Sequence, residues 1–248
     1  LAADELPRTH NPAKGWFATA NEMNLPDGFP IGQVKLGFEW AEGSRAKRIK
    51  EVLGADAQVS LADSMALQLD HHSAMAERLP TLAAALSSSD PPTAEAVGML
   101  RSWDGRIGRD SAAAALFEIW LTRYLQPETV RRLAPKLPPE LLGPASTDAI
   151  VSHLEQASAG SAGRRTSEAI LLASLKAAMT DATARLGPDR SAWTWGRLHR
   201  ARFQHALAPL ADQATRAQLQ TGPLQLGGSA NTPGMAAYGP DFLMIHRA

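Results

Sequence analysis

The spacing of apolar and polar residues divides the chain into a loop-rich start, a helical middle and a loop-rich end. Prolines and glycines recur every few residues up to Gly37, which favours short strands and loops over helices. From residue 44 the apolar positions recur at helical spacing, and the last thirty residues return to frequent Gly and Pro. We therefore expect a mainly α fold with short β segments at both ends, an α+β arrangement. The predicted divisions are a strand and loop segment at 1–43, a helical region at 44–215 and a loop and strand segment at 216–248.

Start and stop signals place the helices within the middle region. Ser60, with Asp63 three residues later, resembles a capping box, and we expect the helix that it opens to run to Pro80 and to continue at 82–86. The small residues of 158–163 predict a flexible connector between two later helices.

The most apolar of the predicted helices lies at 112–125. Either Asp110 or Ser111 is suited to cap it, and its apolar residues are spread so broadly that we expect deep burial. The other predicted elements are helices at 45–53, 93–103, 148–156 and 166–186, a short helix opened by Pro127, and a closing strand at 238–245.

The composition is that of an ordinary globular protein. Hydrophobic residues make up 44% and charged residues 20% of the chain, and Lys+Arg and Asp+Glu are equal at 25 each, so no net charge attracts nucleic acid. The absence of Cys excludes disulfides and thiolate catalysis. No apolar run approaches the ~20 residues that span a bilayer, and no signal peptide is visible, so we expect a mature chain or a fragment with no membrane span.

Two groups of histidines invite a metal interpretation. Asp70, His71 and His72 are adjacent, and adjacent helical positions point in different directions, so we interpret them as a partly exposed helix face. His199 and His205 are six residues apart and do not share a helix face, so a packed junction with the nearby tryptophans is favoured. A histidine-metal protein built on these five residues remains a further hypothesis.

The basic and glycine-rich segments supply no catalytic motif by themselves. Arg45, Lys47, Arg48 and Lys50 are most simply a solvated helix face. The sequence lacks Gly-X-Ser-X-Gly, and the glycines of 158–163 are not followed by the Lys-Ser/Thr of a phosphate-binding loop. Individual residues therefore indicate a mainly helical protein without a visible catalytic set.

An ordered series of short motifs nevertheless covers nearly the whole chain. Its first member is a turn and a short extended run that ends in the carboxamide of Asn21. The series is Gly15-Trp16-Phe17-Ala18-Thr19-Ala20-Asn21, Trp40 with Arg45 and Arg48-Ile49, Leu67-Gln68-Leu69-Asp70, Trp103-Asp104-Gly105, Asp110-Ser111-Ala112, Trp195-Gly196 with His199 and His205, and Gly227-Gly228 with Asn231-Thr232. In this order the motifs resemble the C-terminal portion of the β subunit of the penicillin acylases (penicillin amidases), a family of N-terminal nucleophile (Ntn) hydrolases.

The resemblance implies a function that the separate motifs do not. Members of that family cleave amides of penicillins, cephalosporins or acyl-homoserine lactones with an N-terminal Ser whose own α-amino group acts as the base. Matching the first motif assigns the oxyanion-binding carboxamide to Asn21, and the second assigns its supporting guanidinium to Arg45. Asn24 is a near alternative in poorer register, and Asn21 is alternatively an Asx-turn residue at the end of a strand.

The resemblance also implies partners and a location. The helical region would belong to the β subunit of an Ntn αββα sandwich, whose partners are the remaining part of the β subunit and the α subunit of the same precursor, in the periplasm or secreted. Leu1 is not a nucleophile, so we expect the nucleophile to lie outside this chain and the segment alone to be inactive.

No cofactor is expected for the chemistry. Many relatives bind a structural calcium, but Asp27, the one aspartate between the Asn21 and Arg45 motifs, fits that register poorly, and we assign no metal ligand. The main alternative to an enzyme is a non-catalytic helical binding or structural module that retains the family motifs.

Overall fold

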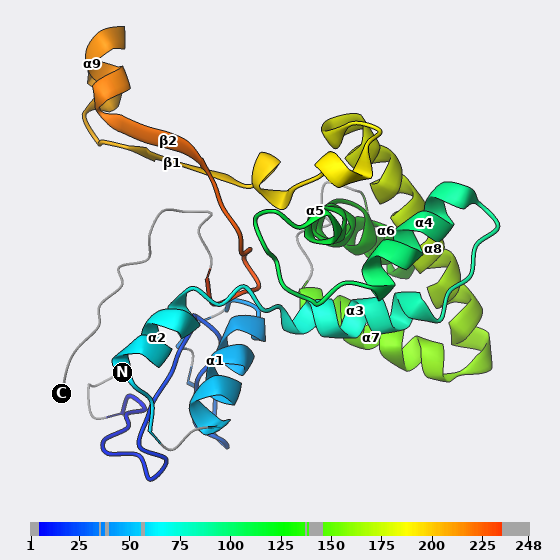
Figure 1. Cartoon of the computed structure of the whole chain (residues 1–248). Coiled ribbons are helices and arrows are strands. Elements are labelled where there is room, and N and C mark those ends of the chain that lie inside the picture. The colour runs from blue at the N-terminus through cyan, green and yellow to red at the C-terminus, as the bar shows by residue number, and fades with distance from the viewer. Residues whose placement is uncertain are drawn as a thin grey trace.

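The computed structural model describes residues 5–34, 36–37, 40–55, 58–136, 138 and 146–234, and these form a mainly helical protein with one two-stranded antiparallel sheet (Figure 1). The predicted mainly α fold with short β segments is confirmed. The α-helices are α1 (Ser44–Ala55), α2 (Leu61–Gln68), α3 (Ala74–Ala84), α4 (Pro91–Arg101), α5 (Ala112–Ile119), α6 (Gln126–Leu133), α7 (Thr147–Ala159), α8 (Ser161–Leu186) and α9 (Gln213–Gln218). A π-helical segment η1 (Trp120–Leu125), three short 3-10 turns, η3 (Arg190–Ala192), η4 (Trp195–Arg197) and η5 (Ala208–Leu210), and the strands β1 (Arg200–Gln204) and β2 (Gln220–Gln225) complete the described elements.

The core is a bundle of helices packed around the long helix α8. This helix contacts α4, α5, α7 and η1, and the run α5–η1–α6 passes through the middle of the bundle (Figure 1). The segment 112–125 is deeply buried, as its apolar breadth predicts, and Phe117, Trp120 and Leu121 have no exposed surface. Trp120 Nε1 donates a hydrogen bond of 2.9 Å to Ser174 Oγ on α8, which satisfies the one polar atom of its buried ring.

Side-chain caps fix where the helices begin. Ser60 and Asp63 form a true capping box at α2, with Asp in the place of the usual Glu or Gln. Ser111, rather than Asp110, caps α5 by accepting from the N–H of Ala114. Pro127, which was expected to open a short helix, instead lies inside the continuous helical run α5–η1–α6, directly after the π-helical segment, and Leu125 and Gln126 before it already have helical backbone angles.

Two other predictions for the helical middle are wrong. The helix expected from Ser60 to Pro80 breaks at residues 69–73, because the Asp70 side chain accepts the N–H of His72 and Ser73 starts a new helix by capping Ala76. The connector expected at 158–163 is helical on both sides of Gly160, because its Ala and Ser residues extend α7 and α8 towards each other.

The described part of residues 5–43 forms turns and extended loops in which no strand is assigned. A strand is defined by ladder hydrogen bonds to a neighbour, and the described residues supply no neighbouring strand to this segment. The observed strands β1 and β2 pair instead near the other end of the chain, with Arg200 opposite Gln225, so β1 lies inside the region predicted to be helical. The predicted strand at 238–245 lies outside the described residues, and the three-part division of the chain remains a prediction.

Beside the bundle, α1 and α2 lie next to the N-terminal loop, whereas β1 and β2 form an arm that carries α9 at its far end (Figure 1). The α1 helix contacts the bundle at α3. None of the described helices is both long and apolar enough to cross a membrane.

Candidate active site

The turn around Asn21 follows from the local sequence. Asn21 adopts a left-handed backbone conformation, with φ of +67°, which Asn tolerates better than most residues. Its carbonyl oxygen accepts the N–H of Ala41 at 2.9 Å, so the loop that precedes α1 returns against the turn. The neighbouring Ala20 and Glu22 are buried, whereas Asn21 itself is exposed. The structure therefore presents this carboxamide at the surface of a tightly held turn.

Arg45 in the first turn of α1 reaches this carboxamide. Its Nη2 donates a hydrogen bond of 3.0 Å to Asn21 Oδ1, although the two residues are 24 positions apart in the sequence. A guanidinium has only donors, so the amide oxygen is the atom that it engages. The Nδ2 amino group of Asn21 keeps its two N–H donors on the other side of the carboxamide. The two residues predicted from the motifs are thus brought together, and their role in catalysis stays a prediction.

Glu22 binds the turn from inside. One carboxylate oxygen accepts the N–H of Ala20 at 2.7 Å, and the other accepts Lys50 Nζ of α1 at 3.0 Å. Burial raises the pKa of the Glu22 carboxyl, but the Ala20 N–H and the Lys50 ammonium lower it by more, so its net pKa lies below the ordinary value. Glu22 is therefore a buried carboxylate held by one backbone donor and one cation.

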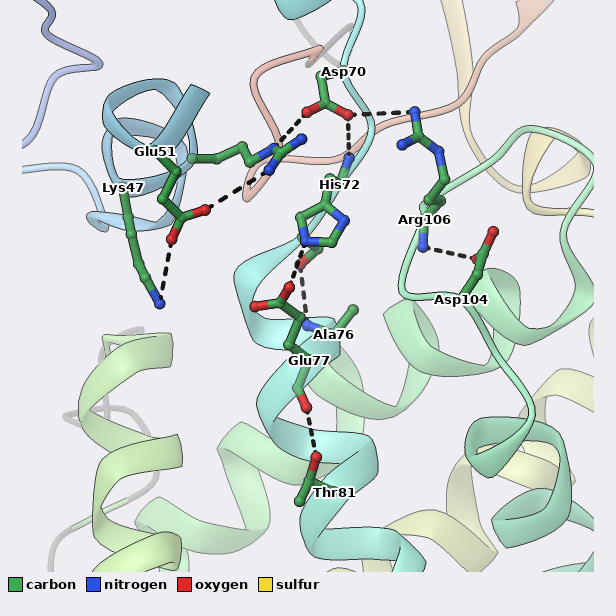
Figure 2. Close-up of polar contacts among 11 residues, drawn as sticks. Lys47, Glu51, Asp70, His72, Ala76, Glu77, Thr81, Asp104 and Arg106 are labelled. Atoms are coloured by element: carbon green, nitrogen blue, oxygen red, sulfur yellow. Dashed lines mark hydrogen bonds and ion pairs between the residues drawn. The ribbon is translucent and has the colours of Figure 1, made fainter. Parts of the chain in front are cut away.

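Arg48 connects the same helix to the bundle through Asp70. Figure 2 shows Asp70 beside His72 and Arg106. Arg48 Nε lies 2.6 Å from Asp70 Oδ2, while Asp70 Oδ1 accepts the His72 N–H at 3.0 Å and lies 3.3 Å from Arg106 Nη2. Burial raises the pKa of Asp70, and the hydrogen bonds and charges of Arg48, His72 and Arg106 lower it below the ordinary value. Asp70 is therefore an ionised hub between α1, the start of α3 and the loop after α4.

The interpretation of the basic residues of α1 as a solvated face holds for the exposure of Lys47 and Lys50 but misses the bonds that three of the four residues make. Arg45, Lys50 and Arg48 each bond an acceptor outside the helix, at Asn21, Glu22 and Asp70 respectively. The Lys47 side chain is 55% exposed, and its ion pair at 3.8 Å is with Glu51 of the same helix. The spacing alone does not reveal this difference, because each acceptor lies on another segment.

Asp70, His71 and His72 are also not a helix face, because they lie in the break between α2 and α3. His71 and His199 are each half-buried, and burial is the main cause that lowers the pKa of both imidazoles. His205 is exposed. Within the described part of the chain, no three His, Cys, Asp or Glu side chains gather as metal ligands would, so the histidine-metal hypothesis gains no support. The structural calcium that many relatives bind has no ligands assigned in this chain.

The closing motif packs onto this hub. The loop 226–234 donates the N–H of Gly228 to Ile107 O at 2.7 Å and the N–H of Gly234 to Asp70 O at 2.8 Å, and Trp195 Nε1 donates to Gly228 O at 2.8 Å. The close approach requires glycine, because a Cβ at 227 would lie 2.6 Å from the His71 ring. Hydrogen bonds and close packing thus join several motifs that are distant in the sequence. These contacts have a structural role and do not form a catalytic group.

The surface hollows among the helices lie away from Asn21. One of about 430 Å³ is formed by η1, α6 and α8, and one of about 500 Å³ lies between α3 and α4 and the loop that follows. No residue that lines either of them belongs to the N-terminal loop or to α1. Neither hollow is therefore the site that the Asn21 carboxamide serves.

A surface carboxamide braced by an arginine, on a turn joined to a helical bundle, is the arrangement that the motif series predicts. Comparison with known families agrees: the family model described as penicillin amidase matches residues 1–247. The chain belongs to the penicillin amidase family.

Curated relatives are acyl-homoserine lactone acylases named QuiP. Those from Pseudomonas fluorescens and Pseudomonas putida are 28% and 30% identical to this chain over 264 and 265 residues. Each alignment covers 95% of this chain but only 31% and 32% of the relative. A QuiP from Pseudomonas aeruginosa is 27% identical over 270 residues. The chain thus spans about a third of the length of the relatives that it matches.

Proposed function

We propose that this chain is part of an amide hydrolase in which the Asn21 carboxamide binds the oxyanion. The observation that carries the proposal is the 3.0 Å hydrogen bond from Arg45 Nη2 to Asn21 Oδ1. It leaves the Nδ2 donors of an exposed carboxamide directed away from the guanidinium, where an incoming carbonyl oxygen can accept one of them.

The reaction begins with attack of a Ser hydroxyl on the amide carbonyl, which moves an electron pair onto the carbonyl oxygen. The nucleophile is the N-terminal Ser of the family, supplied by polypeptide outside residues 1–248, and its α-amino group takes the hydroxyl proton. Asn21 Nδ2 donates to the developing oxyanion. A neutral amide suits this role because it needs no particular protonation state, and one such donor is worth about 3–4 kcal/mol in the transition state.

Arg45 supports the donor in two ways. Its hydrogen bond fixes the rotation of the carboxamide, so the donor is already oriented when the substrate arrives. Its positive charge also withdraws electron density through the amide and makes the Nδ2 hydrogens better donors. Arg45 acts through Asn21 and is therefore a positioning residue.

The substrate class is an N-acyl amide. The names of the relatives favour an N-acyl-homoserine lactone, and the side-chain amide of a β-lactam antibiotic is the alternative within the family. By resemblance to the family, we assign most of the acyl pocket to other polypeptide. The partners are the rest of the β subunit and the α subunit, and the proposed location is the periplasm or the exterior.

The test is Asn21→Ala in the complete enzyme, assayed on N-acyl-homoserine lactones, with Asn24→Ala as the matched control. Asn24 is also exposed and only three residues away, and it is the alternative donor from the sequence. We expect Asn21→Ala to lower kcat about 100- to 1,000-fold and Asn24→Ala to change it less than about two-fold.

Near-normal turnover by folded Asn21→Ala would remove Asn21 from the mechanism. The reverse pattern, with the loss in Asn24→Ala, would move the donor to Asn24. A complete wild-type protein that binds but does not cleave N-acyl amides would favour the non-catalytic helical module.

A further inference from the structure

The Asn21 turn is held by more than Arg45. The guanidinium engages only the side chain of Asn21, whereas the backbone adopts a φ of +67° that an L-residue does not favour. A carboxamide on a backbone that relaxed to another conformation would point elsewhere. The question is therefore which group keeps the backbone in place.

Glu22 occupies the position from which this control is possible. It follows Asn21 directly, and its carboxylate folds back to accept the N–H of Ala20, the residue just before Asn21, at 2.7 Å. The Glu22 side chain and the backbone from Ala20 to Glu22 thus form a small hydrogen-bonded ring that contains the Asn21 backbone. Glu22 is only 8% exposed, so this hydrogen bond is sheltered from competing water.

Lys50 supplies the charge that allows a carboxylate at this buried position. Its Nζ lies 3.0 Å from the second oxygen of Glu22 and comes from α1, the helix that also carries Arg45. A single helix therefore contacts both the side chain and the backbone ring of the turn. Movement of the turn relative to α1 would break both contacts.

We propose, on the basis of the function proposed above, that Glu22 paired with Lys50 is a positioning residue that sets the direction of the Asn21 carboxamide. Glu22 does not touch the substrate. It holds the backbone at residues 20–22 so that the hydrogen bond from Arg45 and the Nδ2 donor of Asn21 are aligned at the moment of attack. Misalignment of a preformed donor reduces the stabilisation of the transition state more than it reduces the binding of the substrate.

The test uses the complete enzyme and four substitutions at the pair. Glu22→Ala removes the ring, and we expect kcat to fall about 10- to 100-fold with KM within about two-fold of wild type. Glu22→Gln keeps an acceptor for the Ala20 N–H, and we expect a smaller loss. Lys50→Met is expected to lower kcat about 5- to 10-fold, while Lys50→Arg, which preserves the cation, is expected to restore kcat to within about two-fold of wild type.

A second measurement separates positioning from general damage. A boronic acid that carries the acyl group forms a tetrahedral adduct with the Ser and places an oxygen where the oxyanion would be. Its affinity should fall in parallel with kcat across the four variants while KM does not change. Glu51→Gln is the matched control: Glu51 is on the same helix, its side chain is 44% exposed, and its nearest cations lie 3.8 Å away. It should leave kcat unchanged.

Lys50→Met reports if Glu22→Ala does not fold, because the Lys50 side chain is 45% exposed and its removal leaves no cavity in the turn. Glu22→Gln, which removes the buried charge that Lys50 offsets, reports if Lys50→Met does not fold either. The inference is overturned if those of these three variants that fold keep kcat within two-fold of wild type, or if KM rises as much as kcat falls. An impaired Asn21→Ala beside unimpaired Glu22 and Lys50 variants would leave the proposed function standing and reject only this pair. An active Asn21→Ala would reject both.

Discussion

Glu118 is a carboxylic acid in the wall of the helical core. It lies on α5 and is 5% exposed, and burial raises the pKa of its carboxyl to about 7, although a hydrogen bond with Ser229 opposes the rise. Among the described residues its Oε1 has no hydrogen-bond partner. The protonated acid is therefore the form that this position accepts, and the Ser229 contact ties α5 to the loop 226–234.

This pKa predicts a pH dependence of stability. The unfolded carboxyl titrates near 4.5 and the folded one near 7, so between these values the folded state binds more protons and stability falls as the pH rises. The loss reaches about 3 kcal/mol above pH 7, at about 1.4 kcal/mol per pKa unit. We expect Glu118→Gln, which stays neutral, to be more stable than wild type by about 2–3 kcal/mol at pH 8 and nearly equal at pH 4.5. Hydrogen exchange of the amides of residues 117–121 measures this, and an equal difference at both pH values would contradict it.

At the same scale, the residues that sequence reasoning found and missed differ in a physical way. Asn21 and Arg45 were predictable because the motif series retains them at fixed places. Glu22 was missed although it follows Asn21 directly, because a lone Glu in a loop most often faces water and its partner Lys50 is 28 positions away. Asp70 was interpreted as part of a partly exposed helix face because the helix that Ser60 opens was expected to run to Pro80, whereas Asp70 is buried in the break. The available signal was Ser73, a residue type typical of the N-cap of a helix, which here accepts the N–H of Ala76.

At the scale of the elements, the ion pair between Arg48 and Asp70 is one of the contacts that attach α1 to the rest of the molecule. The Arg48 Nε to Asp70 Oδ2 distance of 2.6 Å joins α1 to the break between α2 and α3, and the side chains of Arg48 and Asp70 are 27% and 10% exposed. Pairs that are this sheltered lose more when one partner is removed than surface pairs do, because the other charge stays partly buried.

A double-mutant cycle tests this attachment. We expect Asp70→Asn and Arg48→Met each to lower the free energy of unfolding by about 1–3 kcal/mol, and the double variant to lose about 1 kcal/mol less than their sum. Urea unfolding measures all three. The exposed pair Lys47 and Glu51 is the control, with an expected coupling below about 0.5 kcal/mol. Additive losses for Asp70 and Arg48 would show that the ion pair does not hold α1.

Most of the helices were predictable from local signals. Of the two exceptions, the helix break has a local cause and the missed strand has a tertiary one. Caps and apolar breadth predict most of the helices, and Ser60 and Ser111 act as expected where α2 and α5 begin. The break at 69–73 was missed because apolar periodicity takes no account of local side-chain caps: Asp70 accepts the N–H of His72, and Ser73 caps the start of α3. The strand β1 was also missed, since its ladder needs a partner some twenty residues later.

For the whole molecule, the loop 226–234 is the segment that joins parts distant in the sequence. It contacts the hub at Asp70, the loop at Ile107 and the aromatic residue Trp195, and it continues from β2 of the arm. From their order along the chain, the motif series predicted that these segments are parts of one family pattern. It did not predict that they touch, because order along a chain says nothing about distance in space.

Gly228 is the residue on which this junction depends most. Its φ is +74°, and a Cβ at this position would collide with the carbonyl oxygen of Gly234 across the loop. We therefore expect Gly228→Ala to release the loop, with a loss of about 3 kcal/mol or more in the free energy that keeps it docked, because strain and collision act together. Gly28→Ala separates the two effects: Gly28 has nearly the same φ, +78°, but no atom lies within 4 Å of its added Cβ, so only strain of about 1 kcal/mol is expected. Hydrogen exchange of the Gly234 amide, which donates to Asp70 O, reports the docking directly. Equal protection of that amide in the two variants would mean that the loop accommodates the methyl group, and the junction would then not depend on Gly228.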